Sequence, residues 1–112
     1  METINWKDFE KVEMRVGTIF RVENFPEAKK PAYQVWVNLG PDLGVKKSSA
    51  QITALYTREQ LLNRQVICVC NFPKKQIAGF MSEVLITGFP DEHGDIVLAA
   101  TERRVPDGSR LL

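Results

Sequence analysis

Two cysteines and one histidine are the side chains of this sequence best suited to bind a metal or to react as nucleophiles. Cys68 and Cys70 lie two residues apart in an apolar run, which places both thiols on one face of a strand. A structural zinc site needs four ligands, and the sequence holds no other cysteine. We therefore predict that both are reduced, inert core residues. His93 lies among acidic residues without the spacing of a calcium loop, and we predict a solvated turn there.

Two adjacent serines, Ser48 and Ser49, are the remaining candidates for catalysis. They follow two lysines in the segment GVKKSS, which lacks the glycine and the spacing of a phosphate-binding loop. No base stands near them in the sequence, and a single turn histidine is a poor member of a catalytic triad. We expect a binding protein that is not an enzyme and needs no cofactor or metal.

The segment NFPKKQIAGFMSEVL, residues 71–85, is the one that least resembles plain scaffolding. It joins a basic corner, Lys74-Lys75, to an apolar pair, Phe80-Met81, that we expect to be exposed. An exposed apolar patch is uncommon on a small protein, so this pair either binds a ligand or covers the end of the fold. The basic corner suits phosphates, and the apolar pair suits unfolded chains.

The composition describes one ordinary globular domain. The chain has 112 residues, a formal net charge of +1 and no apolar run long enough for a membrane helix, so we expect no membrane insertion. Its acidic, amphipathic first residues do not resemble a signal peptide, and two closely spaced cysteines suit a reducing compartment. We expect a cytoplasmic protein. Basic residues occur in four doublets, which form either one phosphate-binding face or four unrelated solvated corners: Lys29-Lys30, Lys46-Lys47, Lys74-Lys75 and Arg103-Arg104.

The hydrophobic periodicity predicts a chain of short strands with two helices. Helices are expected at 5–11 and at 54–62, the second capped by Thr57. Strands are expected at 14–23, 33–39, 45–52 and 65–72, followed by two strands joined by a hairpin turn at 90–95. In the first strand, strict alternation places Phe20 on the same face as Val16 and Val22, and Gly17 suggests a bend or bulge.

This order of elements predicts an all-β fold, a Greek-key barrel with small helical additions. Five or more short strands with a helix between the third and fourth are typical of the OB-fold. OB-folds bind oligonucleotides or peptides across their second and third strands. Trp36 lies on the polar side of the expected second strand, where it either contacts a ligand or packs under a loop.

Four segments of the sequence resemble a known family. These are MRVGTI at 14–19, PAYQVWVNLG at 31–40, SSAQIT at 48–53 and the segment 71–85. Together they are similar to the CsaA family of chaperones linked to protein secretion, within the wider family of tRNA-binding domains. The resemblance implies a single OB-fold domain over residues 1–112 with short N- and C-terminal extensions, a homodimer and no enzymatic activity.

The resemblance also implies two sets of site residues. For tRNA or another RNA they are Asn71, Lys74, Lys75 and Ser82; for unfolded or preprotein polypeptides they are Trp36, Phe80 and Met81. The sequence departs from the tRNA-binding pattern at Val84-Leu85, where those relatives carry Gly-Met. A β-branched residue in place of glycine fills space beside the basic corner. We therefore favour chaperone-type polypeptide binding, with RNA binding as the alternative.

The two ends of the chain independently predict a homodimer. Ile4, Trp6 and Phe9 near one end, and Val105, Leu111 and Leu112 at the other, are apolar where small proteins usually fray into solvent. A barrel of this size has little room to bury both ends itself, so a second subunit is the natural cover.

Overall fold

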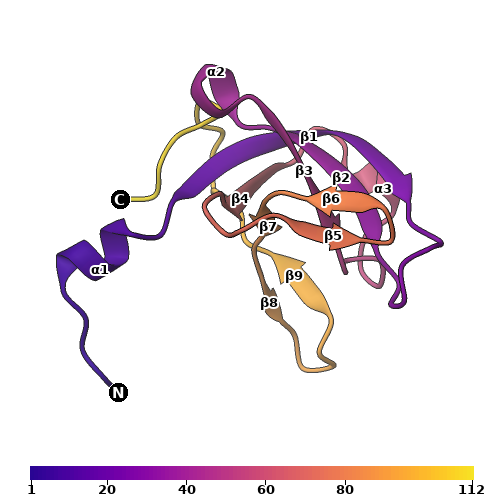
Figure 1. Cartoon of the computed structure of the whole chain (residues 1–112), viewed down its shortest axis with the longest axis horizontal. Coiled ribbons are helices and arrows are strands. Elements are labelled where there is room, and N and C mark those ends of the chain that lie inside the picture. Colours follow the sequence, from indigo (N-terminus) through magenta and orange to yellow (C-terminus); the bar gives the residue numbers. More distant parts are fainter.

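The computed structural model describes residues 1–112, and five of its strands form one antiparallel sheet that curls into a barrel (Figure 1). The strand order is β3-β2-β1-β4-β7, so β3 and β7 are the two edges. This is the β-rich barrel that the sequence predicts, with the third helix between its third and fourth strands. The bounds of the five strands are β1 Met14–Asn24, β2 Tyr33–Asn38, β3 Val45–Ala50, β4 Gln65–Val69 and β7 Leu85–Ile86.

Two hairpins and three short helices complete the fold. One hairpin consists of β5 (Lys75–Ile77) and β6 (Phe80–Ser82), and the other of β8 (Gly88–Pro90) and β9 (Ile96–Leu98). The helices are α1 (Trp6–Glu10), α2 (Gly40–Leu43) and α3 (Arg58–Leu61). The predicted turn at 90–95 is confirmed, because it joins β8 to β9.

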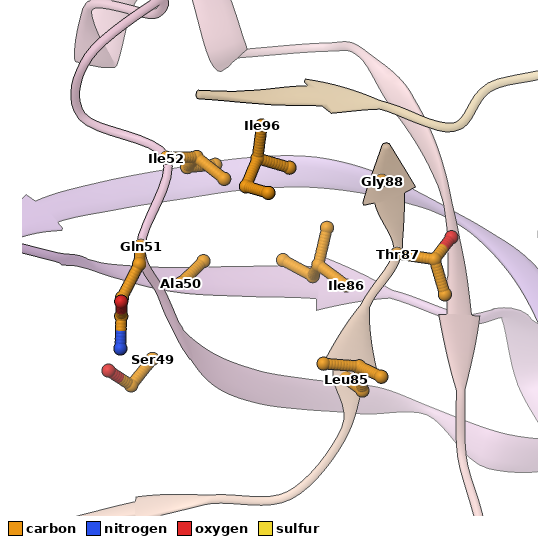
Figure 2. Close-up of a pocket in the computed structure, with 9 residues that line it drawn as sticks. All are labelled: Ser49, Ala50, Gln51, Ile52, Leu85, Ile86, Thr87, Gly88 and Ile96. Carbon is orange, nitrogen blue, oxygen red and sulfur yellow. The ribbon is translucent and has the colours of Figure 1, made fainter. Parts of the chain in front are cut away.

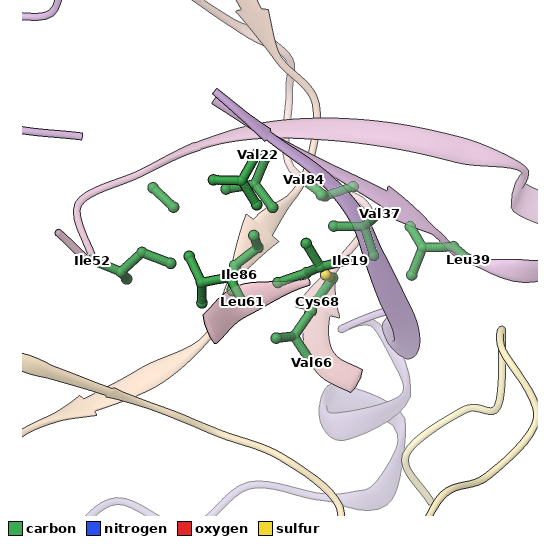
Figure 3. Packing of buried hydrophobic residues seen from close by; sticks show 12 residues of the cluster. Ile19, Val22, Val37, Leu39, Ile52, Leu61, Val66, Cys68, Val84 and Ile86 are labelled. Atoms are coloured by element: carbon green, nitrogen blue, oxygen red, sulfur yellow. The ribbon is translucent and has the colours of Figure 1, made fainter. Parts of the chain in front are cut away.

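The core lies inside the curled sheet and draws on every strand of it (Figure 3). Strand β2 shows the predicted alternation, with Val35, Val37 and the following Leu39 fully buried. Strand β4 is buried on both faces, as its unbroken apolar sequence predicts. The cluster comprises Ile19, Val22, Val35, Val37, Leu39, Ala50, Ile52, Leu61, Val66, Cys68, Val84 and Ile86.

The predicted alternation of β1 is wrong beyond Ile19. The pairing of β1 with β2 shifts by one residue between Ile19 and Arg21, so Phe20 forms a bulge and is exposed. Ile19 and Val22 are then both buried. Gly17, where the sequence suggested the bulge, instead allows close packing, because a Cβ there would lie 2.5 Å from Cγ1 of Val37.

The second predicted helix is shorter than expected. Thr57 caps α3 as predicted, through a reciprocal pair of hydrogen bonds with Gln60. The residues before Thr57 are not helical, because Tyr56 is tied elsewhere. Its carbonyl accepts a hydrogen bond from the Tyr33 hydroxyl at 2.8 Å, and its own hydroxyl accepts one from Leu98 N–H at 3.0 Å.

The β5–β6 hairpin was not predicted from the sequence. Its turn residues, Ala78 and Gly79, both have positive φ, 45° and 81°. This is the backbone twist that two-residue hairpins favour, usually with Asn-Gly or Gly-Gly rather than Ala-Gly. The structure folds this segment back on itself at Ala78-Gly79.

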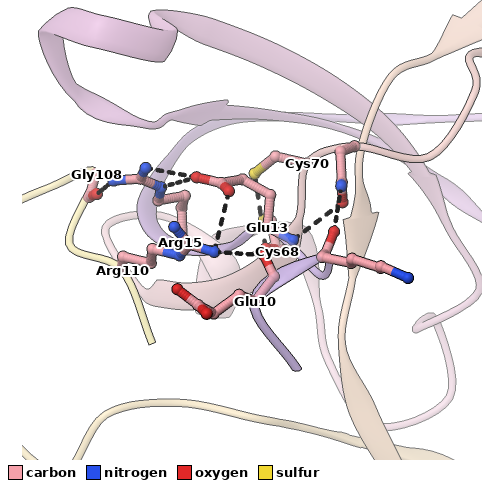
Figure 4. Close-up of polar contacts among 9 residues, drawn as sticks. Glu10, Glu13, Arg15, Cys68, Cys70, Gly108 and Arg110 are labelled. Atoms are coloured by element: carbon pink, nitrogen blue, oxygen red, sulfur yellow. Dashed lines mark hydrogen bonds and ion pairs between the residues drawn. The ribbon is translucent and has the colours of Figure 1, made fainter. Parts of the chain in front are cut away.

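The two terminal segments meet at the start of β1. Asn5 caps α1, which projects from the barrel, while the C-terminal segment runs beside β1 (Figure 1). Val16 N–H donates to Ser109 O at 2.9 Å, and Leu111 N–H to Met14 O at 3.0 Å. Figure 4 shows Glu13 between Arg15 and Arg110, which fixes the charges at this junction.

Candidate binding surface

The β5–β6 hairpin is anchored to the edge strand β3 by Ser82, the last residue of β6, and by Glu83, which follows it. Glu83 N–H donates to Lys47 O at 2.8 Å, and Lys47 N–H donates to Glu83 Oε1 at 3.2 Å. Ser49 N–H donates to the Ser82 hydroxyl at 3.0 Å. Ser82, predicted to contact RNA, therefore accepts a structural hydrogen bond and keeps its hydroxyl proton for a ligand.

The two lysines of the basic corner differ in their surroundings. Lys74 Nζ lies 3.5 Å from Glu83 Oε2, so this charge is compensated within the chain. Lys75 is exposed and forms no ion pair. It opposes Ser82 across the hairpin. Of the two, Lys75 is the charge available to a polyanion.

Asn71 ties the N-terminal segment to the end of β4. Its Oδ1 accepts a hydrogen bond from Glu13 N–H at 3.0 Å, and its Nδ2 donates to Lys11 O at 2.6 Å. Both ends of the amide are thus engaged in a structural role that the sequence pattern did not indicate. Its assignment as an RNA contact stays a prediction, limited to the lone pair and the N–H that remain.

Phe80 is buried, and the expectation that it is exposed is wrong. Only 7% of its surface is accessible, because the ring packs between Phe25, at a centroid distance of 5.4 Å, and Trp36, at 5.7 Å. The hairpin turn folds Phe80 back onto the outside of the barrel. Met81, the next residue, alternates to the other side and is half-buried.

The sequence left open whether Trp36 contacts a ligand or packs against the protein, and the structure leaves room for both. It packs edge-on against Phe80 and is half-buried, yet it lies on the outer face of the sheet. The guanidinium carbon of Arg21 lies 4.2 Å from the centroid of the indole. Lys47 Nζ lies 5.0 Å from the centroid of the Phe80 ring. This side of the barrel therefore carries cations over aromatic rings.

The four basic doublets do not form one face. Alternation along β3 places Lys46 and Lys47 on opposite sides of the strand. Arg104 is held by the C-terminal junction, where it donates to Asn63 O at 3.0 Å and to the Thr18 hydroxyl at 3.2 Å. Lys46-Lys47 and Arg103-Arg104 therefore do not share one basic face. The positive charge near the hairpin comes from Lys47, Lys74 and Lys75.

An open groove lies along the seam of the barrel, where β3 ends and the chain separates from β7 (Figure 2). We call it the seam groove. Its central part has a volume of about 420 Å³. Figure 2 shows Gln51 and Ile52 on one side, Leu85 and Ile86 across from them, and Ile96 of β9 above. The residues that line this part are Ser49, Ala50, Gln51, Ile52, Leu85, Ile86, Thr87, Gly88 and Ile96.

The seam groove continues at both ends. Toward the hairpin, a hollow of about 310 Å³ shares Ser49, Gln51 and Leu85 with the central part. Toward the β8–β9 turn, a hollow of about 400 Å³ shares Gln51, Ile52 and Ile96. Phe72 and Lys75 also line the hairpin end, and Lys30 and Thr53 also line the turn end.

The groove has an apolar floor and basic ends. Ile52 and Ile86 are buried beneath it, whereas Leu85 and Phe72 are exposed beside it. Lys75 lies at one end and Lys30 at the other. Apart from Lys75, sequence reasoning assigned none of these residues to a site, because the groove forms only when the two edges of the sheet approach each other. The apolar Phe72 and Leu85 on either side of the basic corner are the signal in the sequence that could have found it.

The two thiols face different surroundings. Cys68 is buried in the core as predicted, and burial raises its pKa far above the ordinary thiol range. Cys70 lies half-buried at the margin of the core, so its placement inside it was only partly correct. Burial, followed by the negative charge of Glu13, raises the pKa of Cys70. Both thiols are therefore protonated at neutral pH.

His93 occupies an exposed turn, as predicted. The Asp91 carboxylate accepts hydrogen bonds from the backbone N–H groups of His93 and Asp95, both at 2.9 Å. The carboxylate is thus used to close the β8–β9 turn.

The fold and these surfaces define the class of protein. Residues 14–110 match the model of the putative tRNA-binding domain family, and the chain belongs to this family. Two solved structures of this fold are similar to the chain over nearly its full length. The chain is similar to the chaperone CsaA of Bacillus anthracis, with 41% identity, a TM-score of 0.91 and coverage of 99% of this chain and 100% of that one. It is also similar to the CsaA chaperone of Picrophilus torridus, with 43% identity, a TM-score of 0.90 and coverage of 98% and 100%.

A second group of relatives carries the same domain within larger proteins. The methionine–tRNA ligase of Methanocaldococcus jannaschii is 30% identical over an alignment of 113 positions, which covers 99% of this chain and 17% of the ligase. The likeness is therefore confined to a small part of the ligase. These comparisons confirm the predicted OB-type fold and the predicted resemblance. None of the helices has the length and apolar character needed to cross a membrane.

Proposed function

We propose that this protein is a molecular chaperone that binds unfolded or export-bound polypeptides in the seam groove, in the cytoplasm and in connection with protein secretion. The observation that carries the proposal is the groove itself, an open channel with an apolar floor on a chain otherwise small and well packed. The likeness to two CsaA chaperones over nearly the full length supports it.

The apolar side chains of the groove provide the attraction. Leu85 lies in both the central part and the hairpin end, and Phe72 lies beside it. About half of each side chain is exposed in the free protein. Covering the exposed half of a leucine contributes about 1 kcal/mol. Such contacts are non-directional, so they suit clients of many sequences.

The aromatic residues predicted to bind polypeptides act beside the groove in this proposal. Trp36 and Met81 are only partly buried, so each presents some of its side chain to a client. Phe80 is a positioning residue, because its ring is covered by Phe25 and Trp36 and holds the indole against the hairpin. Lys75 and Lys30 at the ends of the groove would attract acidic segments of a client.

We also propose that the protein is a homodimer. Ile4 and Trp6 of the N-terminal segment, and Leu111 and Leu112 at the other end, are exposed in the single chain. The two segments meet at β1, so their apolar side chains can form one interface with a second copy. Light scattering at micromolar concentration should give twice the mass of the chain. A monomer mass at that concentration would refute the dimer.

A second candidate function is tRNA binding, and a separate surface favours it. Lys75 is an uncompensated charge, and Arg21 lies over the Trp36 ring, an arrangement that can hold phosphates and stacked bases. Asn71, Lys74 and Ser82 keep part of their hydrogen-bonding capacity beside it. The family to which the chain belongs is consistent with this role.

Parallel binding measurements with total tRNA and with a permanently unfolded polypeptide test the two functions. Each ligand is titrated at several salt concentrations. Apolar capture predicts that polypeptide affinity changes little with salt, whereas phosphate contacts make RNA affinity fall steeply. Tight, salt-sensitive binding of tRNA without detectable binding of the polypeptide would reverse our preference.

A further inference from the structure

Part of the backbone on one side of the seam groove has no hydrogen-bonding partner. Gln51, Ile52 and Thr53 follow directly on β3, and their N–H groups form no hydrogen bond within the chain, whereas the Ile52 carbonyl closes a turn at Thr53–Leu55. Buried backbone groups are almost always hydrogen-bonded in folded proteins. Free N–H groups beside an apolar channel are therefore a distinct chemical feature.

The same edge is fully used a few residues earlier. Lys47 exchanges two hydrogen bonds with Glu83, and Ser49 N–H donates to the Ser82 hydroxyl. The hairpin thus covers the edge of β3 up to Ser49. Beyond Ser49 the edge of β3 has no covering strand. Gln51 is the next residue whose backbone groups face this edge. An uncovered strand edge is a template for pairing with another extended chain.

We infer that an extended segment of the client binds as an added strand along Gln51–Thr53. This inference rests on the proposed function and specifies how the groove recognises its ligand. Backbone N–H and C=O groups of the client pair with the free groups of residues 51–53, and its inward side chains lie on Ile52, Ile86 and Ile96.

The chemistry of this edge selects the occupant. A row of alternating donors and acceptors matches another polypeptide backbone, and it does not match a phosphodiester, which offers acceptors only. The uncovered edge is short, because the chain enters a turn at Thr53, so it pairs with a short segment of a client. Because every unfolded chain carries the same backbone, the pairing is independent of client sequence. A native helix or sheet has its backbone groups already paired, so this edge favours unfolded chains.

The test uses the full-length protein and three peptides. The first is an unfolded peptide of about ten residues that alternates leucine with serine. The other two carry N-methyl groups either on every leucine or on every serine. An extended strand directs only every second N–H toward a given partner, so one methylated set blocks the pairing and the other does not. Side-chain alternation keeps the leucines on the apolar floor and fixes the register.

Two measurements are made, namely peptide affinity and amide hydrogen exchange at residues 51–53. We expect one of the two methylated peptides to bind about tenfold more weakly than the unmodified one, and the other to bind about equally. We also expect exchange at one or more of these amides to slow at least about tenfold when the unmodified peptide is bound. Exchange is read in the native protein, so the result does not depend on a variant that folds.

The outcomes separate the pairing from the proposed function. If the unmodified peptide binds while exchange at 51–53 is unchanged, or while both methylated peptides bind equally well, the added strand is refuted and capture by the groove stands. If the unmodified peptide does not bind at all, both the pairing and the proposed function are refuted.

Discussion

Phe80 supports the binding surface from beneath. The sequence places it beside a basic corner and suggests a ring offered to a ligand, but the positive φ of Ala78 and Gly79 folds that ring against Phe25 and Trp36. Substitution of a buried aromatic ring leaves a cavity that the surrounding residues refill only in part. A binding defect in a Phe80 variant would therefore reflect altered packing.

The Phe80→Ala variant should consequently lose stability. We expect the free energy of unfolding in urea to fall by about 3 kcal/mol. Phe89→Ala is the matched control, because Phe89 in β8 is 68% exposed and should change stability by less than about 0.5 kcal/mol. Equal stability of the Phe80→Ala variant and the wild type would contradict the burial of this ring.

Lys75 should carry the charge-dependent part of any RNA binding. The Lys75→Glu variant should bind tRNA several-fold more weakly at low salt, because each phosphate contact releases counterions, and should show a smaller dependence on salt. Arg103→Glu makes the same change of charge at an exposed residue of the C-terminal segment and should have little effect. An equal loss in both variants, measured by filter binding, would assign the effect to net charge alone.

The sequence predicted the burial and contacts of some residues but not of others, and the difference has a physical reason. The buried side of β2 and the cap at Thr57 follow from local rules, namely strand alternation and a side chain that reaches its own helix. Phe20 and Asn71 do not. A bulge reverses the side of Phe20, and Asn71 is engaged by residues about 60 positions earlier in the chain.

At the scale of elements, the succession of strands along the chain followed from the sequence, but the edge of the sheet did not. Strands β1 to β4 have at least five residues each, so their hydrophobic pattern can be read, whereas β5 and β6 have three residues each. Their hairpin depends on an Ala-Gly turn without the usual sequence signal. Because this hairpin covers β3 only up to Ser49, the groove and its free backbone lay beyond sequence reasoning.

The C-terminal segment should stabilise the barrel as well as any dimer. Val105 exchanges backbone hydrogen bonds with the buried Gln65 side chain, which donates to Val105 O at 2.7 Å and accepts from Val105 N–H at 3.0 Å. Truncation after Arg104 would leave that amide unsatisfied and remove the hydrogen bonds along β1. We expect the free energy of unfolding to fall by at least about 2 kcal/mol.

A shorter truncation provides the control. Removal of Leu111 and Leu112 alone takes away one hydrogen bond to β1 and two exposed side chains. It should change the unfolding of the barrel by about 1 kcal/mol at most while weakening the dimer in light scattering. Equal stability of the two truncated proteins would show that the segment 105–110 does not hold the barrel together.

At the scale of the whole molecule, the barrel presents two surfaces of different chemistry around one hairpin. The hairpin places Lys75 outward and Phe80 against Trp36, and its attachment to β3 defines one end of the seam groove. In the two functions that we propose, the same scaffold holds a polypeptide by apolar contact or a polyanion by charge. Val84, where tRNA-binding relatives carry glycine, is buried in the core behind this hairpin, so it fills space from within.

Leu85 lines both the central part and the hairpin end of the seam groove, so it provides the most direct test of the central claim. The measurement is the affinity of a labelled, permanently unfolded polypeptide, read by fluorescence anisotropy, for the wild type and two variants. Leu85→Ser removes a groove side chain that is 48% exposed, and Leu62→Ser removes one that is 42% exposed outside the groove. We predict affinity about fivefold weaker for Leu85→Ser, at low and at high salt, and little change for Leu62→Ser. Equal affinity of the wild type and the Leu85→Ser variant would contradict capture of polypeptides in the seam groove.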